Sequence, residues 1–335
     1  MAFALITSGM VTSVGYTAGS SCAAIRCRMS HLSATRFGDP AGGWVQAAWV
    51  PAVSTWGVQR LLDLLVPAVS EALAPLRDGD PAAIVVLVAV AEPQRAGRVT
   101  AVDDLLPALE QRLSRRFHPA SSVIPQGTLS GVAALTRARQ AIDDHGAFCV
   151  LLAGVDSLVV ADTVHQRLAD RSLRTTDHPA GTLLGEAAAV VGLSAPATTL
   201  ADGVLCLGWH IAVATAGDQQ AQVQACVDAI RGACIAAGIT PDDLAGQYGN
   251  LQGREAVVAL AWQRLLRRSK AHFTSHAVDE SLGDIGAAWF PSVAALMFAA
   301  HQRRYNAGEF VVVHLGDADG STAAAVFRFA NSAGA

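Results

Sequence analysis

The segment that decides the fold is residues 121–158, which read SSVIPQGTLSGVAALTRARQAIDDHGAFCVLLAGVDSL. The run 127–131 (GTLSG) opens a helix that ends near His145 and Gly146, and an apolar strand over 148–153 follows directly. Parallel strands of one sheet are joined by helical crossovers of this kind. The segment therefore predicts an α/β protein with at least one strand–helix–strand crossover.

The same alternation continues on both sides of this segment. The run 82–90 is continuously apolar and β-branched, which is typical of a strand covered on both faces. The other expected strands are 2–7, 204–213 and a closing hairpin of 310–315 and 323–329; the other expected helices are 19–29, 57–76, 101–116, 219–238, 253–270 and 290–302. We therefore expect two similar halves, residues 1–195 and 196–335, packed as one compact unit.

The composition indicates a large packed core. Of the 335 residues, 52 % are hydrophobic and only 16 % are charged, with 30 glycines. Such low charge predicts hidden surface, and hence a homodimer, a heterodimer or another protein partner. The formal net charge of -4 and short basic groups, such as 264–270, predict solvated helix faces rather than a nucleic-acid footprint.

The six cysteines form no Cys-x-x-Cys pair, which predicts reduced thiols in a cytoplasmic protein. The N-terminal run MAFALITSGMVTSVG lacks a basic leader and breaks at Gly9, so it predicts a first strand rather than a signal peptide. No uninterrupted apolar stretch reaches the roughly 18 residues of a membrane span.

Six short strings, in order along the chain, resemble those of β-ketoacyl synthases. They are 9–15 (GMVTSVG), 23–26 (AAIR), 130–135 (SGVAAL), 153–157 (AGVDS), 185–189 (GEAAA) and 283–288 (GDIGAA). The resemblance implies the thiolase fold, which is layered α-β-α-β-α, is built from two similar halves and is usually dimeric. The pairing of 123–127 (VIPQG) with 283–288 is also similar to a divergent group of ketosynthase-like proteins encoded beside type VI secretion components.

The resemblance also implies positions for the ketosynthase chemistry, which needs a thiolate at a helix N-terminus and two histidines. Thr128 falls where the cysteine belongs, and Asp284 falls where the second histidine belongs. The lysine expected before that histidine falls near Asp279, and the stretch 246–250 (GQYGN), ending at Asn250, contains no histidine. We therefore expect no catalytic residues, but a vestigial pocket lined by Thr128, Leu129, Asn250, Asp284 and Trp289.

Other chemical groups give weaker signals. Cysteines 22, 149, 226 and 234 lie in apolar strand or helix contexts, which are typical of small buried hydrophobes. His272 and His276 are four residues apart, which allows a metal site on one helix face but is more typical of two exposed histidines at a helix end. Glu186 matches a strand glutamate of the ketosynthases, and the resemblance implies a buried structural carboxylate there. Asp317 and Asp319 lie beside Gly316 and Gly320, a composition that is typical of a turn. We expect no cofactor and no metal.

These expectations leave three functions open. The first is a non-catalytic adaptor or accessory protein, for example in type VI secretion, whose partner would be a secretion component or an effector. The second is a regulatory partner of an active ketosynthase, as chain length factors are, which would bind that ketosynthase or an acyl carrier protein. The third is an acyltransferase or hydrolase that uses Thr128 with Asp284.

Overall fold

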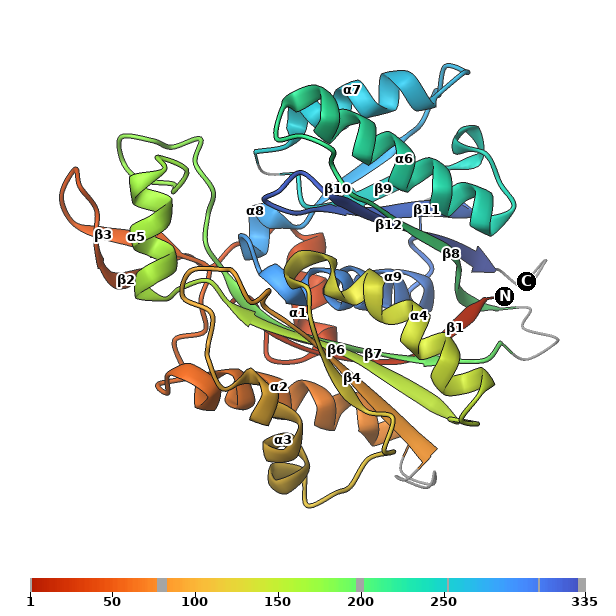
Figure 1. Cartoon of the computed structure of the whole chain (residues 1–335), viewed down its shortest axis with the longest axis horizontal. Helices are drawn as coiled ribbons and strands as arrows, with labels where there is room; N and C mark the ends of the chain where they lie inside the picture. The colour runs from red at the N-terminus through yellow and green to blue at the C-terminus, as the bar shows by residue number, and fades with distance from the viewer. Residues whose placement is uncertain (1, 77–82, 197–201, 252, 307, 331–335) are drawn as a thin grey trace.

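The computed structural model describes residues 2–76, 83–196, 202–251, 253–306 and 308–330. Its main strands form two layers (Figure 1). The first layer contains β1 (Phe3–Thr12), β4 (Ile84–Val90), β5 (Ser122–Pro125), β6 (Cys149–Ser157) and β7 (Glu186–Ser194). The second contains β8 (Gly203–Ala212), β9 (Gly246–Gly249), β10 (Thr274–Ala277), β11 (Phe310–Gly316) and β12 (Thr322–Ala330). A separate small sheet pairs β2 (Ser33–Gly38) with β3 (Trp44–Ala47).

The two layers repeat one topology. The first has the strand order β1-β7-β6-β4-β5 and the second has the order β8-β12-β11-β9-β10. Each layer thus places its first strand beside its last and ends in three parallel strands. The layers join where β1 pairs with β8 through only Phe3 and Ala4. The chain passes from the first layer to the second between Ser194, where β7 ends, and Gly203, where β8 begins, and the division into halves at residue 195 stays a prediction.

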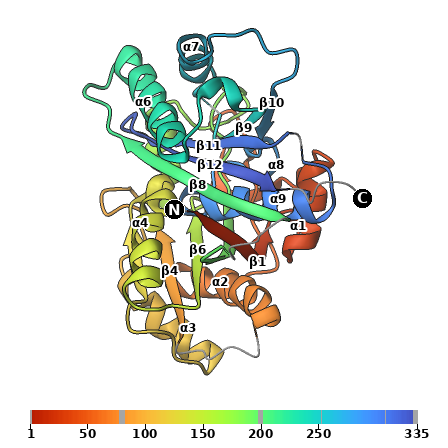
Figure 2. The same ribbon diagram turned by 90° about the vertical axis from the view of Figure 1, so that its right-hand side faces the viewer.

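Helices lie on both sides of each strand layer, as Figure 2 shows from the side. The central helices are α1 (Ala18–Arg26), α4 (Ser130–Asp143) and α9 (Trp289–Gln302). The outer helices are α2 (Gly57–Leu73) and α3 (Leu105–Leu113) on the first layer and α6 (Gln219–Ala237) and α7 (Glu255–Leu265) on the second. Two further helices, α5 (Ala161–Ala169) and α8 (Asp279–Leu282), flank the loops. The predicted α-β-α-β-α arrangement is confirmed.

Strand β4 shows how the sequence produces these layers. All seven of its residues are buried, as the continuous apolar run predicted. Successive side chains of a strand point to opposite faces. Accordingly, Ile84, Val86 and Val88 pack in the core under α2 and α3, while Val85 and Leu87 pack in the core around α4 and α9. A strand buried on both faces is what a five-layered protein requires.

The first strand is longer than predicted. Strand β1 continues through Gly9 to Thr12, where the sequence predicted a turn. A side chain on Gly9 would place its Cβ 2.0 Å from the carbonyl oxygen of Ala68 in α2. Gly9 therefore allows a helix to pack closely on the strand, and it does not break the strand.

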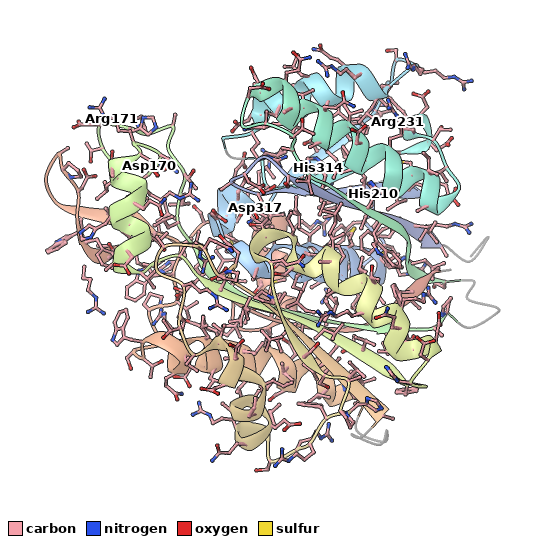
Figure 3. The ribbon with its side chains drawn as sticks, in the orientation of Figure 1. Asp170, Arg171, His210, Arg231, His314 and Asp317 are labelled. Atoms are coloured by element: carbon pink, nitrogen blue, oxygen red, sulfur yellow. The ribbon has the colours of Figure 1, made fainter. Side chains whose placement is uncertain are left out.

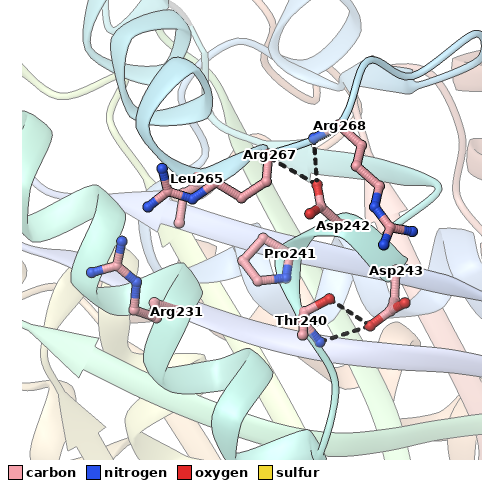
Figure 4. Close-up of a pocket in the computed structure, with 8 residues that line it drawn as sticks. All are labelled: Arg231, Thr240, Pro241, Asp242, Asp243, Leu265, Arg267 and Arg268. Atoms are coloured by element: carbon pink, nitrogen blue, oxygen red, sulfur yellow. Dashed lines mark hydrogen bonds between the residues drawn. The ribbon is translucent and has the colours of Figure 1, made fainter.

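Helix α7 is shorter than predicted, because the chain turns away after Leu265. The backbone amides of Arg267 and Arg268 donate to the carboxylate of Asp242, at 3.0 and 3.2 Å (Figure 4). These hydrogen bonds hold the segment in a non-helical path along a pocket of about 510 Å³. The pocket is also lined by Arg231, and the arginine side chains are exposed there, as predicted for a solvated face.

The two candidate metal-binding histidines do not share a helix, so the helix expected at their position is wrong. His276 lies in β10 and stacks on Tyr248 of β9, with ring centroids 4.3 Å apart, whereas His272 lies in a loop. Among the described residues, no three histidine, cysteine or acidic side chains gather as metal ligands. None of the described helices is both long and apolar enough to span a membrane.

Candidate functional site

The principal cavity is an open cleft of about 1010 Å³, lined by loops that follow strands of both layers. Residues at or just after the carboxyl ends of six strands line it: Glu92 (β4), Gln126 (β5), Leu158 (β6), Asn250 (β9), Asp279 (β10) and Asp317 (β11). Ligands of open α/β sheets bind at this end of the strands. In Figure 3, Asp170 beyond α5 and Asp317 beyond β11 lie on opposite sides of this region.

All five residues of the predicted vestigial pocket line this one cleft. Thr128 and Leu129 enter it from the first half, and Asn250, Asp284 and Trp289 enter it from the second. Trp289 is only 1 % exposed, so its indole forms part of the packed floor. The structure thus brings together residues that lie up to 161 positions apart, from Thr128 to Trp289.

The turn between β5 and α4 presents Thr128 to the cleft. The backbone amide of Gln126 donates to the Ser130 hydroxyl (2.8 Å), which itself donates to the carbonyl of Val90 at the end of β4 (3.2 Å). The Thr128 side chain is half-buried, and no hydrogen bond from its hydroxyl to another described residue is found. A threonine hydroxyl needs an adjacent base to become a nucleophile. Within the described chain, no base accepts a hydrogen bond from the Thr128 hydroxyl.

Asp284 is held by the backbone that follows it. Its Oδ1 accepts from the amide of Gly286 (3.1 Å) and from the indole Nε1 of Trp289 (3.3 Å). Its Oδ2 lies 3.5 Å from Nη2 of Arg167, a weak and partly exposed ion pair. The carboxylate is therefore a fixed anion in the cleft wall. It cannot stabilise the negative charge that develops on a thioester oxygen.

Asn250 binds the protein's own backbone. Its Nδ2 donates to the carbonyl of Gly316 (2.7 Å), and its Oδ1 accepts from the amide of Gly316 (2.9 Å). The same Oδ1 accepts from Nη1 of Arg254 (3.0 Å). Arg254 packs so closely on Gly316 that a Cβ there would lie 1.8 Å from the guanidinium carbon. Asn250 therefore clamps the end of β11, where the ketosynthase pattern has a histidine.

A buried ion pair behind the cleft was not predicted from the sequence. Arg95 donates twice to Asp156, at 2.6 and 2.5 Å, and the two side chains are 14 % and 3 % exposed. Asp156 also accepts from the amide of Ala287 (3.0 Å). The pair thus joins the loop after β4, strand β6 and the start of α9. The available signal was Asp156 itself, an acidic residue inside an otherwise apolar strand sequence.

Two carboxyl groups of the cleft have raised pKa values. Burial raises the pKa of Glu92; Arg95 opposes this, and the charges of Asp317 and Asp156 add to it. Burial also raises the pKa of Asp317, with Asp319 and Asp284 adding to the effect. Carboxyl groups from both halves therefore face one another across a partly dry, acidic cleft.

Glu186 has the structural role that the sequence predicted. It is fully buried and accepts from Nε of Arg60 (2.7 Å), the amide of Val50 (2.7 Å) and the hydroxyl of Ser157 (2.7 Å). These bonds tie β7 to α2 and to the loop after β3. A carboxylate saturated in this way has no capacity left for a substrate.

The cysteines offer no nucleophile to the cleft. All six thiols are free, and none lines the cavity. Burial raises the pKa of Cys22, Cys149, Cys206 and Cys234 to about 12 and that of Cys226 to about 11. Cys27 is exposed at the end of α1. The five buried cysteines are inert hydrophobes, as the sequence predicted for those in strands and helices.

Comparisons with known proteins agree with this architecture. No family profile and no curated protein sequence matches the chain. Among solved structures, the ishigamide ketosynthase/chain length factor superposes with a TM-score of 0.74 at 19 % identity, covering 98 % of this chain and 99 % of that one. The oxazolomycin ketosynthase domain of Streptomyces albus gives 0.77 at 14 % identity, covering 98 % and 75 %. The chain has a ketosynthase-like thiolase fold.

A third structure, the ketosynthase of module 6 of the Bacillus subtilis bacillaene synthase, gives a TM-score of 0.76 at 11 % identity, covering 98 % of this chain and 72 % of that one. Identities this low establish the fold alone. None of the comparisons relates the chain to type VI secretion, so that part of the resemblance stays a prediction.

Proposed function

We propose that this chain is a non-catalytic partner subunit of a cysteine-bearing ketosynthase, as chain length factors are. The observation that carries the proposal is the state of its cleft. The cleft is present, but the positions matched to the nucleophile and the second histidine hold Thr128 and the fixed carboxylate of Asp284. The stretch matched to the first histidine, 246–250, ends in Asn250, which is bound to the backbone of Gly316.

The similar structures support a partner function. One is a ketosynthase/chain length factor whose matched chain has the same extent as this one, since the two cover 98 % and 99 % of each other. Another is a ketosynthase in complex with an acyl carrier protein, matched over 98 % of this chain and 99 % of that one at 12 % identity. A subunit of this size and fold, without its own nucleophile, suits the accessory position in such a pair.

The sheet offers a place for a partner strand. β5 is the outermost strand of the first layer, and among the described strands only β4 pairs with it. An unpaired strand edge is a template for pairing with another chain. The turn that carries Thr128 follows β5 directly, so a partner bound along this edge would contact the cleft's own wall.

Co-expression with a cysteine-bearing ketosynthase from the same source tests the proposal. We expect a stable 1:1 complex by size exclusion with light scattering, and acyl transfer activity that requires both chains. A ketosynthase that is equally active alone and never co-purifies with this chain would refute the proposal.

An adaptor function in type VI secretion remains the alternative proposal, and it rests on the sequence resemblance alone. A pull-down with this chain from cells of its source separates the two functions. Recovery of a secretion component or effector, with no ketosynthase or acyl carrier protein, would favour the adaptor.

A further inference from the structure

The left-handed position in the turn between β5 and α4 is Gly127. Its φ of +55° is open to glycine without strain, whereas Thr128, the next residue, follows in a short 3₁₀ turn that runs into α4. A residue with a side chain would be strained at position 127, as nucleophiles displayed on strand-to-helix turns are. By this backbone criterion, the equivalent of a nucleophile's position is residue 127, one position before Thr128, the residue matched by sequence.

The side chain of Glu92 fills the space beside Gly127. A Cβ built on Gly127 would lie 2.1 Å from Oε2 of Glu92 and 2.9 Å from its Cδ. Non-bonded heavy atoms approach favourably only to about 3.5 Å. The carboxyl group of Glu92 therefore stands where the side chain of residue 127 would project.

Several contacts hold the backbone of Glu92 beside this turn. It follows β4 by two residues, and the buried Ser130 hydroxyl ties the end of β4, at Val90, to the amide of Gln126. The amide of Arg95 donates to the carbonyl of Glu92 (3.2 Å), which closes the loop beneath its side chain. The backbone of Glu92 and the backbone of Gly127 are thus held in register by a buried hydroxyl.

The second half of the chain repeats this arrangement. A 3₁₀ turn, Gly286–Ala288, leads into α9 as Gly127–Leu129 leads into α4, and Gly286 has a φ of +50°. A Cβ on Gly286 would lie 2.1 Å from Oδ2 of Asp156. Both turns into the central helices therefore begin with a left-handed glycine covered by a carboxylate. Arg95 pairs with Asp156, and its charge also acts on Glu92.

We propose that Glu92 takes the place of the nucleophile's side chain at Gly127 and thereby excludes a covalently bound acyl group from the cleft. The inference rests on the proposed function and deepens it, because it names a further obstacle to catalysis beside the losses at Thr128 and Asp284. Replacing Gly127 alone then cannot restore a reactive thiol. Residue 92 must be shortened as well.

Alkylation of an introduced thiol tests this pair. All variants carry Cys27→Ser, which removes the exposed native thiol. We compare three proteins: Gly127→Cys alone, Gly127→Cys with Glu92→Ala, and Gly127→Cys with Glu92→Gln. The probe is iodoacetamide at pH 7, followed by intact mass. We expect alkylation to be at least about tenfold faster with Glu92→Ala, since a nearby carboxylate raises a thiol pKa and one unit changes the thiolate fraction about tenfold. Glu92→Gln removes the charge but keeps the volume, so it should give an intermediate rate.

Thr128→Cys is the control, because residue 128 is the position that the sequence matches to the nucleophile. Its alkylation rate should change less than about twofold when Glu92→Ala is added, because residue 128 does not share the space of Glu92. Equal rates for Gly127→Cys with and without Glu92 would overturn the proposal. So would a rate that depends on residue 92 only in Thr128→Cys.

A stability measurement keeps the test decisive if Gly127→Cys does not fold. Gly146 has a similar φ of +64°, and a Cβ there meets nothing within 4 Å. We expect Gly127→Ala to lower the Tm by several degrees more than Gly146→Ala, and this excess to disappear with Glu92→Ala. An excess that persists without Glu92 refutes the steric pairing. Complex formation with the ketosynthase is measured separately. If the complex forms but Glu92 and residue 127 show no steric coupling, this inference is overturned and the proposed function is not.

Discussion

The clamp that Asn250 forms on Gly316 gives a prediction whose size follows from the structure. Asn250→Ala removes three hydrogen bonds: two to the backbone of Gly316, at 2.7 and 2.9 Å, and one from Arg254, at 3.0 Å. Each such bond contributes about 1 kcal/mol net, so we expect the free energy of unfolding to fall by about 3 kcal/mol. Urea unfolding followed by tryptophan fluorescence measures this change.

Two further variants at this position separate the structural account from a catalytic one. Asn250→Asp keeps the two acceptor bonds but sets a carboxylate oxygen against the Gly316 carbonyl oxygen, so it should also destabilise the protein, and more at pH 7 than at a pH where the carboxyl group is protonated and can donate. Asn250→His introduces a histidine into the stretch where the resemblance implies one, but one imidazole cannot reproduce both bonds to Gly316. We expect it to destabilise the protein and to create no acyl transfer activity. An Asn250→Ala protein within about 0.5 kcal/mol of wild type would refute the clamp.

Three other predictions follow from buried groups. Glu186→Gln should lower the free energy of unfolding by about 3 to 5 kcal/mol, because it leaves the buried Arg60 guanidinium without its counter-charge; urea unfolding would show no such loss if the pair were dispensable. Glu92 has a folded-state pKa above its ordinary 4.5, so the folded state binds more protons in that window and stability falls as pH rises through it. Glu92→Gln should therefore raise the Tm relative to wild type at pH 7 but not at pH 4, and an equal shift at both values would contradict this. Native protein should take up a single iodoacetamide adduct, at Cys27, and Cys27→Ser should take up none until unfolded; a second native adduct would show that a thiol counted as buried is accessible.

Local sequence patterns predicted the layers of the fold well but predicted some element boundaries poorly. The apolar run of β4 predicts a strand covered on both faces because burial on both faces requires it. The role of Gly9 could not be predicted in the same way. The sequence shows a glycine whether the residue forms a turn or lies beneath a packed helix. Only the contact with Ala68 of α2 in the folded protein shows that Gly9 has the second role. Similarly, the early end of α7 depends on Asp242, which is distant in sequence from the residues it captures.

The cleft was predictable residue by residue, but its interactions were not. The resemblance placed Thr128, Asn250 and Asp284 near one another, and all three line one cavity. What each side chain contacts depends on residues that are distant in sequence, such as Gly316 at the end of β11, which binds Asn250. Glu92 belongs to none of the six strings that resemble ketosynthases, so its contact with Gly127 became visible only in three dimensions.

The repeat within the chain was also predictable only as architecture. The two turns into α4 and α9 share a left-handed glycine and little else, since Gly127-Thr128-Leu129 matches Gly286-Ala287-Ala288 at one position in three. Topology is conserved between the halves by packing requirements that many sequences satisfy. The equivalence is therefore evident in the strand order and not in the residues.

The most direct test of the central claim is to locate the acyl group after transfer. The purified complex of this chain with its cysteine-bearing ketosynthase is incubated with acyl-loaded acyl carrier protein, and the intact mass of each chain is measured. We expect an acyl adduct on the ketosynthase cysteine and none on this chain. An adduct on this chain that maps to Thr128 would contradict it.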